Sequence, residues 1–255
     1  HWHGRNPLQG RSDIITAAVK HTQRYKIAVA SGASEQEINR IMNTPVMMNV
    51  FTWRGERELM MTPIDSIKHY LQFLNSGMLA MDPHDGSILA WVGGINHHYF
   101  QYDHVRERTR RQVGSVFKPV VYAAALERGA DPCDYISSAQ VTYDNAWTPK
   151  NADEKYDLNF SMAGALALSV NTVSVKVLQK AGIKNVIALA RAMGIQSELP
   201  PYPSLALGTA SLSMMEMVRA YACMVNEGRP VTPFCIKAIT SADGKLLESF
   251  KPVYQ

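Results

Sequence analysis

The chain has 255 residues, of which 46% are hydrophobic and 19% charged, and its formal net charge is +4. This composition is typical of a folded globular protein and excludes an intrinsically disordered chain. The basic residues are scattered except for four arginines within 106–111, which we interpret as a solvated face, so we expect no nucleic acid among the partners.

Residues 1–75 are predicted to form a small α+β module. Its helices are signalled by polar N-cap residues, with a capping box at Ser34–Glu37 and with Pro63 in a first helical turn. A stretch rich in valine, methionine and aromatic residues predicts a strand. In chain order the predicted elements are a helix over 14–25, a helix over 34–43, a strand over 45–53 and a helix over 63–74.

From Gly77 the pattern changes to that of a larger domain. Two short apolar runs on either side of the turn signal Asp82–Gly86 predict a β-hairpin. A polar, irregular segment follows up to Val113, after which the chain is predicted to be mostly helical. The predicted strands are 78–81, 87–92, 229–240 and 245–250, and the predicted helices are 115–128, 161–169, 171–181, 184–193 and 213–227.

The cysteines and histidines form no metal-binding pattern. Cys133, Cys223 and Cys235 are irregularly spaced and no C-x-x-C motif occurs, which fits small apolar side chains better than a zinc or redox site. His97 and His98 fall in a predicted loop without carboxylates at ligand spacing. We therefore expect neither a metal nor a cofactor.

Ser115 and Lys118 carry the strongest chemical signal. They are one helical turn apart, so a helix places both side chains on one face. A serine hydroxyl needs a base within hydrogen-bond reach, and a lysine can be that base when burial lowers its pKa. Pro119 sets the helix start near Ser115, at the positive end of the helix dipole. A capping serine beside an unrelated surface lysine is the alternative, but the apolar helix around Lys118 favours catalysis.

A second candidate motif is Ser169-Val170-Asn171, at a break between two helical patterns. A serine and an amide two residues apart in a tight turn can project toward one cleft. A helix C-cap followed by an N-cap explains the same residues equally well, so this motif alone does not decide between the two interpretations.

Together, S-x-x-K and S-x-N resemble the signature of serine transpeptidases and β-lactamases. The stretch 111–119 (RQVGSVFKP) is similar to the R-Q-x-G-S-x-F-K-P of class A penicillin-binding proteins. Further similar stretches follow the family order and cover 79–94, 147–151 (WTPKN), 165–171 (ALALSVN) and 204–228. From about residue 77, the chain therefore resembles the transpeptidase domain of that family.

The resemblance implies an α+β fold, with a transpeptidase domain over 76–255 in which helices flank an antiparallel sheet. Residues 1–75 would be a linker or pedestal module. Ser115 would attack the penultimate D-Ala carbonyl of a peptidoglycan stem peptide, Lys118 would take its proton, and an amine of a second stem peptide would resolve the acyl-enzyme. β-Lactams would acylate the same serine.

The resemblance also implies roles for the remaining site residues. Ser169 would relay a proton to the leaving group, Asn171 would hold Lys118 and the substrate amide, and the Ser115 N–H would supply half of an oxyanion hole. Substrate-binding positions would be Gly114, Trp147 and Asn151. The site would lie on the extracytoplasmic face of the bacterial inner membrane, attached only through an N-terminal anchor absent from this sequence, with cell-wall synthesis proteins as further partners.

One family motif, K-[ST]-G, is missing from the sequence after Asn171. The acidic glycosyltransferase motifs of class A proteins are also missing. We expect both ends to be cuts, the remaining strands to follow Gln255, and this chain alone to accept penicillin poorly. The alternatives are a non-catalytic docking piece of a cell-wall complex and a β-lactamase-like hydrolase, although no E-x-x-L-N motif supports the latter.

Overall fold

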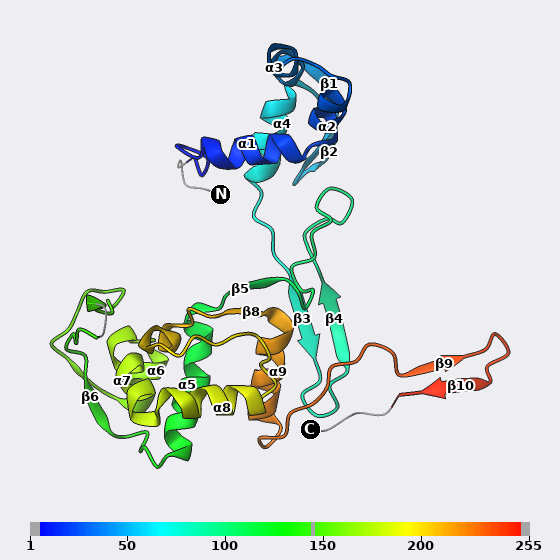
Figure 1. Cartoon of the computed structure of the whole chain (residues 1–255). Helices are drawn as coiled ribbons and strands as arrows, with labels where there is room; N and C mark the ends of the chain where they lie inside the picture. The colour runs from blue at the N-terminus through cyan, green and yellow to red at the C-terminus, as the bar shows by residue number, and fades with distance from the viewer. Residues whose placement is uncertain (1–5, 144–145, 251–255) are drawn as a thin grey trace. The chain divides into compact units, whose positions relative to one another are not determined.

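The computed structural model describes residues 6–143 and 146–250 (Figure 1). The chain divides into two compact units, a first unit of residues 1–75 and a second unit of residues 76–255. Within the described ranges, no helix is both long and apolar enough to cross a lipid bilayer.

In the first unit, four helices contact one another beside a two-stranded antiparallel hairpin. Thr22, Ser34 and Thr62 each cap a helix by accepting a hydrogen bond from a backbone N–H of the first turn. The elements are α1 (Ser12–His21), α2 (Gln23–Ala30), α3 (Glu35–Asn43), β1 (Val46–Thr52), β2 (Gly55–Met61) and α4 (Pro63–Leu71). The predicted strand and the two later helices are confirmed.

Two features of this unit differ from the sequence prediction. The single helix predicted over 14–25 is two helices, because Thr22 leaves the helical conformation and caps α2 with its side chain. Strand β2 was not predicted because its sequence, GERELMM, lacks alternation and only Met61 is partly buried. It nevertheless pairs with β1 along its whole length.

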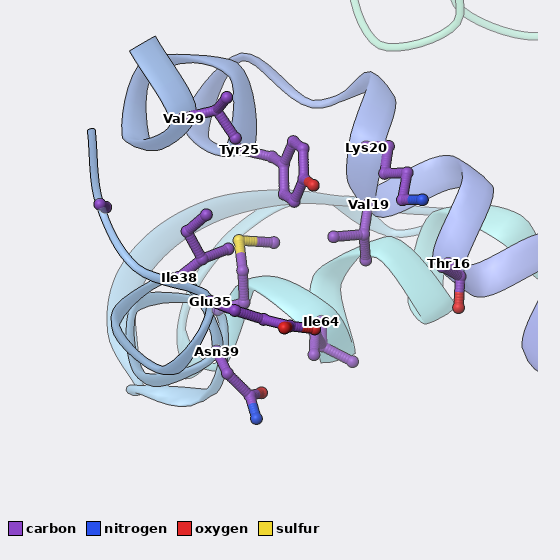
Figure 2. Close-up of a pocket in the computed structure, with 11 residues that line it drawn as sticks. Thr16, Val19, Lys20, Tyr25, Val29, Glu35, Ile38, Asn39 and Ile64 are labelled. Carbon is purple, nitrogen blue, oxygen red and sulfur yellow. The ribbon is translucent and has the colours of Figure 1, made fainter. Parts of the chain in front are cut away.

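A pocket of about 650 Å³ lies among the helices of the first unit. Figure 2 shows Val19 and Tyr25 reaching toward Ile38 and Ile64 across the hollow, with Lys20 beside them. The first unit therefore leaves part of its apolar interior open.

The second unit is built around the buried helix α5 (Lys118–Glu127), six of whose residues are buried. Helices from later in the chain contact it on several sides, as Figure 1 shows for α7 and α8. Its Val120 and Val121 pack in one apolar core with residues such as Leu178 and Leu205. The surrounding elements are α6 (Met162–Ala167), α7 (Asn171–Ala181), α8 (Ile183–Ala192), η3 (Pro203–Leu207) and α9 (Met214–Val225).

The ladders of the described ranges are two-stranded and antiparallel. The predicted hairpin is confirmed, whereas the three-residue strands β5 to β8 are too short for alternation to reveal them. In the second unit the pairs are β3 (Met78–Met81) with β4 (Ile88–Val92), β5 (Arg110–Gln112) with β8 (Ser211–Ser213), β6 (Tyr135–Ser137) with β7 (Asn159–Ser161), and β9 (Ala238–Thr240) with β10 (Leu246–Ser249).

The strand predicted over 229–240 is shorter than expected. Only Ala238–Thr240 pairs with β10, while Phe234 forms a parallel bridge to Ser87 at the start of β4. Pro230 and Pro233 explain the difference, because proline has no N–H to donate to a ladder.

Candidate active site

Ser115 lies in a single 3-10 turn, η1 (Gly114–Phe117), between β5 and α5. The prediction of an α-helix from Ser115 is therefore wrong in detail, because the α-helix begins at Lys118, with Pro119 in its first turn. Ser115 is exposed to solvent. Its hydroxyl has no hydrogen-bond partner among the residues that the structure describes, so it is free to meet a ligand.

The turn is held in place by a close backbone contact between Gly114 and Gly208. The Gly114 N–H donates to the Gly208 carbonyl at 2.9 Å, next to the β5–β8 pair. Gly208 has a φ of +68°, and a Cβ on it would lie 1.9 Å from the Gly114 carbonyl oxygen. Only glycine fits at position 208, because a side chain there would clash with Gly114. Gly208 is far from Ser115 in the sequence, so this contact depends on the tertiary fold.

Lys118 is buried, and its ammonium points to the Ser169–Asn171 motif. Its Nζ donates to the Ser169 carbonyl at 2.6 Å, to the Ser169 Oγ at 2.9 Å and to the Asn171 Oδ1 at 2.7 Å. The structure thus brings three of the four predicted catalytic residues into direct contact, with Ser115 one turn before Lys118 in the chain.

Burial lowers the pKa of Lys118 to about 8. All three acceptors on its Nζ belong to uncharged groups, so no carboxylate there stabilises the protonated form. Only 1% of Lys118 is exposed, which is unusual for a lysine. The lowered pKa makes the amine easier to deprotonate near neutral pH, as a general base requires.

Ser169 owes its position to the way α6 ends. The Ser169 N–H donates to Leu166 and the Val170 N–H donates to Ala165, which together make a Schellman motif. The left-handed position of this motif is usually glycine, but here it is Ser169, with a φ of +56°. Such a conformation costs about 1 kcal/mol or more in a residue with a Cβ. The backbone is thus strained at Ser169, the residue whose hydroxyl contacts Lys118.

Asn171 is the first residue of α7 and joins Lys118 to a neighbouring loop. While its Oδ1 accepts from Lys118, its Nδ2 donates to the Lys150 carbonyl at 2.8 Å. The side chain is half-buried. Both ends of the amide are thus fixed, which settles its orientation toward the lysine.

The predicted substrate-binding residues Trp147 and Asn151 lie on the loop between β6 and β7. Asn151 is buried, and its amide donates to Lys155 and accepts from the Thr172 N–H at 3.0 Å. Trp147 is half-buried and packs its ring on Tyr143. These contacts are internal, so a substrate-binding role for either residue stays a prediction.

Tyr221 of α9 supports the turn that carries Ser115, and Glu216 fixes the start of α9 beside β8; neither role was predicted from the sequence. Tyr221 donates its hydroxyl to the Val116 carbonyl at 2.9 Å, directly after Ser115. Glu216 completes a capping box with Ser213, the last residue of β8. The S-x-x-E spacing could have revealed the box, whereas no local pattern reveals the long-range contact of Tyr221.

Comparison with known proteins identifies the family of the chain. The family model of the penicillin-binding protein transpeptidase domain matches residues 76–254, and that of the penicillin-binding protein middle domain matches residues 2–74. The chain belongs to the penicillin-binding protein transpeptidase family. The resemblance inferred from its motifs is therefore confirmed.

Relatives within the penicillin-binding proteins include two curated bacterial proteins. The chain is 36% identical over 183 residues to penicillin-binding protein 1A of Pseudomonas aeruginosa, covering 69% of this chain and 22% of the relative. It is also 36% identical over 184 residues to penicillin-binding protein 1A of Aquifex aeolicus, covering 70% and 25%. The chain thus spans about a quarter of the length of these curated relatives.

Solved structures of penicillin-binding proteins share the fold. A crystal structure of penicillin-binding protein 1A from Haemophilus influenzae has a TM-score of 0.67 at 30% identity, covering 71% of this chain and 28% of that one. An imipenem acyl-enzyme complex of penicillin-binding protein A from Mycobacterium tuberculosis has a TM-score of 0.63 at 17% identity, covering 71% and 52%. The predicted α+β transpeptidase fold is confirmed.

Proposed function

We propose that this chain carries the acylating half of a peptidoglycan D,D-transpeptidase, with Ser115 as the nucleophile and Lys118 as its base. The observation that carries the proposal is the buried amine of Lys118, which contacts both Ser169 and Asn171 and lies one helical turn after an exposed serine. Membership of the transpeptidase family supports the same chemistry.

In the first half-reaction, the Ser115 Oγ attacks the carbonyl of the penultimate D-Ala of a stem peptide and its proton passes to neutral Lys118. The C–N bond to the terminal D-Ala then breaks, and the departing amine receives the proton through the Ser169 hydroxyl. This route requires Lys118 to be neutral beforehand. Its pKa of about 8, lowered by burial, supports that requirement.

In the second half-reaction, an amine of another stem peptide attacks the acyl-enzyme. Lys118 removes a proton from that amine and returns one to Ser115, so that the cross-link forms and the serine is regenerated. A neutral lysine carries two protons and one lone pair, whereas the structure has three acceptors around the Nζ. One of these contacts must therefore be released, which leaves the lone pair of the neutral amine free to take the proton of Ser115.

The proposal extends to the setting of the reaction. β-Lactams would acylate Ser115, as the acyl-enzyme complex of the Mycobacterium tuberculosis protein illustrates for that relative. Gly114, Trp147 and Asn151 would line or support the substrate cleft, and residues 1–75 would serve as a linker or pedestal. The site would act outside the cytoplasmic membrane, where peptidoglycan is cross-linked.

The test uses the full-length protein that contains this chain. A synthetic stem peptide ending in D-Ala-D-Ala is incubated with an amine acceptor, and products are followed by mass spectrometry. We expect release of D-Ala with formation of the aminolysis product, and loss of both in Ser115→Ala. Absence of D-Ala release by the wild-type protein would favour the docking-piece alternative, and fast turnover of a chromogenic cephalosporin would favour a β-lactamase.

A further inference from the structure

A second polar link joins α5 to α7 close to the contacts of Lys118. Tyr122 lies one turn after Lys118 on α5, and Ser174 lies about one turn after Asn171 on α7. The two helices are in contact (Figure 1). The Tyr122 hydroxyl is 3.3 Å from the Ser174 Oγ. The Ser174 Oγ in turn donates to the Val170 carbonyl at 2.8 Å.

The direction of these hydrogen bonds follows from counting protons. The Val170 carbonyl only accepts, so the single hydroxyl proton of Ser174 is used on it. The Tyr122 hydroxyl must then be the donor to Ser174. The result is a chain from Tyr122 through Ser174 to Val170, whose carbonyl sits between Ser169 and Asn171.

This chain of hydrogen bonds is shielded from water. Tyr122 is 3% exposed and Ser174 is fully buried. Burial raises the pKa of Tyr122, so the hydroxyl keeps its proton near neutral pH. Buried hydrogen bonds in series strengthen one another and define a single geometry. The link is therefore suited to hold the start of α7 at a fixed distance from α5.

The link between Tyr122 and Ser174 holds the strained turn that begins at Ser169. Ser169 has a left-handed backbone, and such a conformation persists only where the surroundings impose it. The carbonyl of the next residue, Val170, accepts a hydrogen bond from Ser174 on α7. The carbonyl of Ser169 itself accepts one from Lys118 on α5. Tyr122 and Lys118 thus act from the same helix on successive residues of one turn.

We propose that Tyr122 and Ser174 are positioning residues that fix the Ser169–Asn171 turn and, through it, the acceptors around the Lys118 amine. This inference rests on the proposed function, because positioning matters only if Lys118 takes the proton of Ser115. It assigns a purpose to two buried hydroxyl groups that the reaction itself does not use.

The test measures penicillin acylation of the full-length protein in Tyr122→Phe, Ser174→Ala and the double variant. The limiting acylation rate and the concentration for half-maximal acylation are determined separately, with the melting temperature of each variant. We expect the limiting rate to fall about 10-fold in each single variant, since small misplacements of catalytic groups are costly. The half-saturating concentration should change less than about twofold, because the penicillin contacts are unaltered.

The double variant should lose no more than the larger single loss, since both changes break one chain of hydrogen bonds. Tyr70→Phe is the matched control: it removes a tyrosine hydroxyl that accepts from the Phe51 N–H in the first unit. It should leave the limiting rate unchanged. If Ser174→Ala does not fold, Tyr122→Phe decides alone, because it keeps the ring volume.

An unchanged limiting rate in folded Tyr122→Phe would overturn the positioning role while leaving the proposed function intact. Failure of the wild-type protein to be acylated would instead overturn the proposed function on which the inference rests. Additive losses in the double variant would also overturn the proposal, because they would mean that the two hydroxyl groups act independently.

Discussion

The Nζ of Lys118 lies 2.7 Å from the Oδ1 of Asn171, although the two residues belong to different helices, α5 and α7. The same amide donates to the Lys150 carbonyl, so Asn171 joins the buried lysine to the loop that carries Trp147 and Asn151. Because an amide is neutral, it orients the amine without stabilising its charged form as a carboxylate would. This arrangement suits the proposed role of Lys118, in which the lysine loses and regains a proton.

Lys118→Ala should slow acylation more than Asn171→Ala does. Removing a general base typically costs about 10²–10⁴ in rate, whereas removing a residue that orients the base leaves the base in place. Second-order rate constants for penicillin acylation of both variants provide the comparison. Equal losses, or a larger loss in Asn171→Ala, would mean that these roles are misassigned.

Acylation should accelerate as the pH rises toward and through about 8. Burial lowers the pKa of Lys118 to about 8, so the neutral amine becomes the main form above that pH. An unfolded chain keeps its lysine protonated up to near the ordinary pKa of 10.5, so between about pH 8 and 10.5 the unfolded state binds more protons than the folded state. Lys118 therefore makes the folded state more stable as the pH rises across that window. Acylation rates at saturating penicillin between pH 6 and 10 test this, and a flat profile would contradict it.

Ser169→Gly and Ser169→Ala should separate strain from chemistry. Both remove the hydroxyl that contacts Lys118, so both should slow acylation by similar factors. Glycine adopts the left-handed conformation freely, and the same Schellman motif ends α5 with Gly129. Ser169→Gly should therefore be more stable than Ser169→Ala by about 1 kcal/mol in chemical denaturation. Equal stabilities would show that the φ of +56° carries no strain.

Gly208→Ala should damage the nucleophile turn. The added Cβ would meet the Gly114 carbonyl oxygen at 1.9 Å, and relieving such a clash typically costs about 1–3 kcal/mol beyond the backbone strain. Gly129→Ala is the matched control, because Gly129 also has a positive φ but no atom within 4 Å of a Cβ. Melting temperatures and acylation rates should fall further in Gly208→Ala, and equal effects would refute the close-contact explanation.

Local patterns in the sequence predicted the helices well and the site in part. Capping residues and apolar periodicity predicted α3, α4, α7 and the hairpin of β3 and β4. The motif spacing singled out Lys118 and Asn171, whose side chains are in contact in the structure. The short strands β5 and β8 were not predicted, because their pairing joins distant parts of the chain. The roles of Gly208 and Tyr221 were not predicted for the same reason, since their contacts near Ser115 are set by tertiary packing.

Ser115 should form the acyl-enzyme, and this is tested by mapping the penicillin adduct on the protein. The full-length protein is labelled with a fluorescent penicillin, digested and analysed by tandem mass spectrometry, with Ser115→Ala as the control. We expect one adduct, on the Ser115 side chain, which is absent from the variant. An adduct on Ser169 or on any other serine, or labelling that survives in Ser115→Ala, would contradict it.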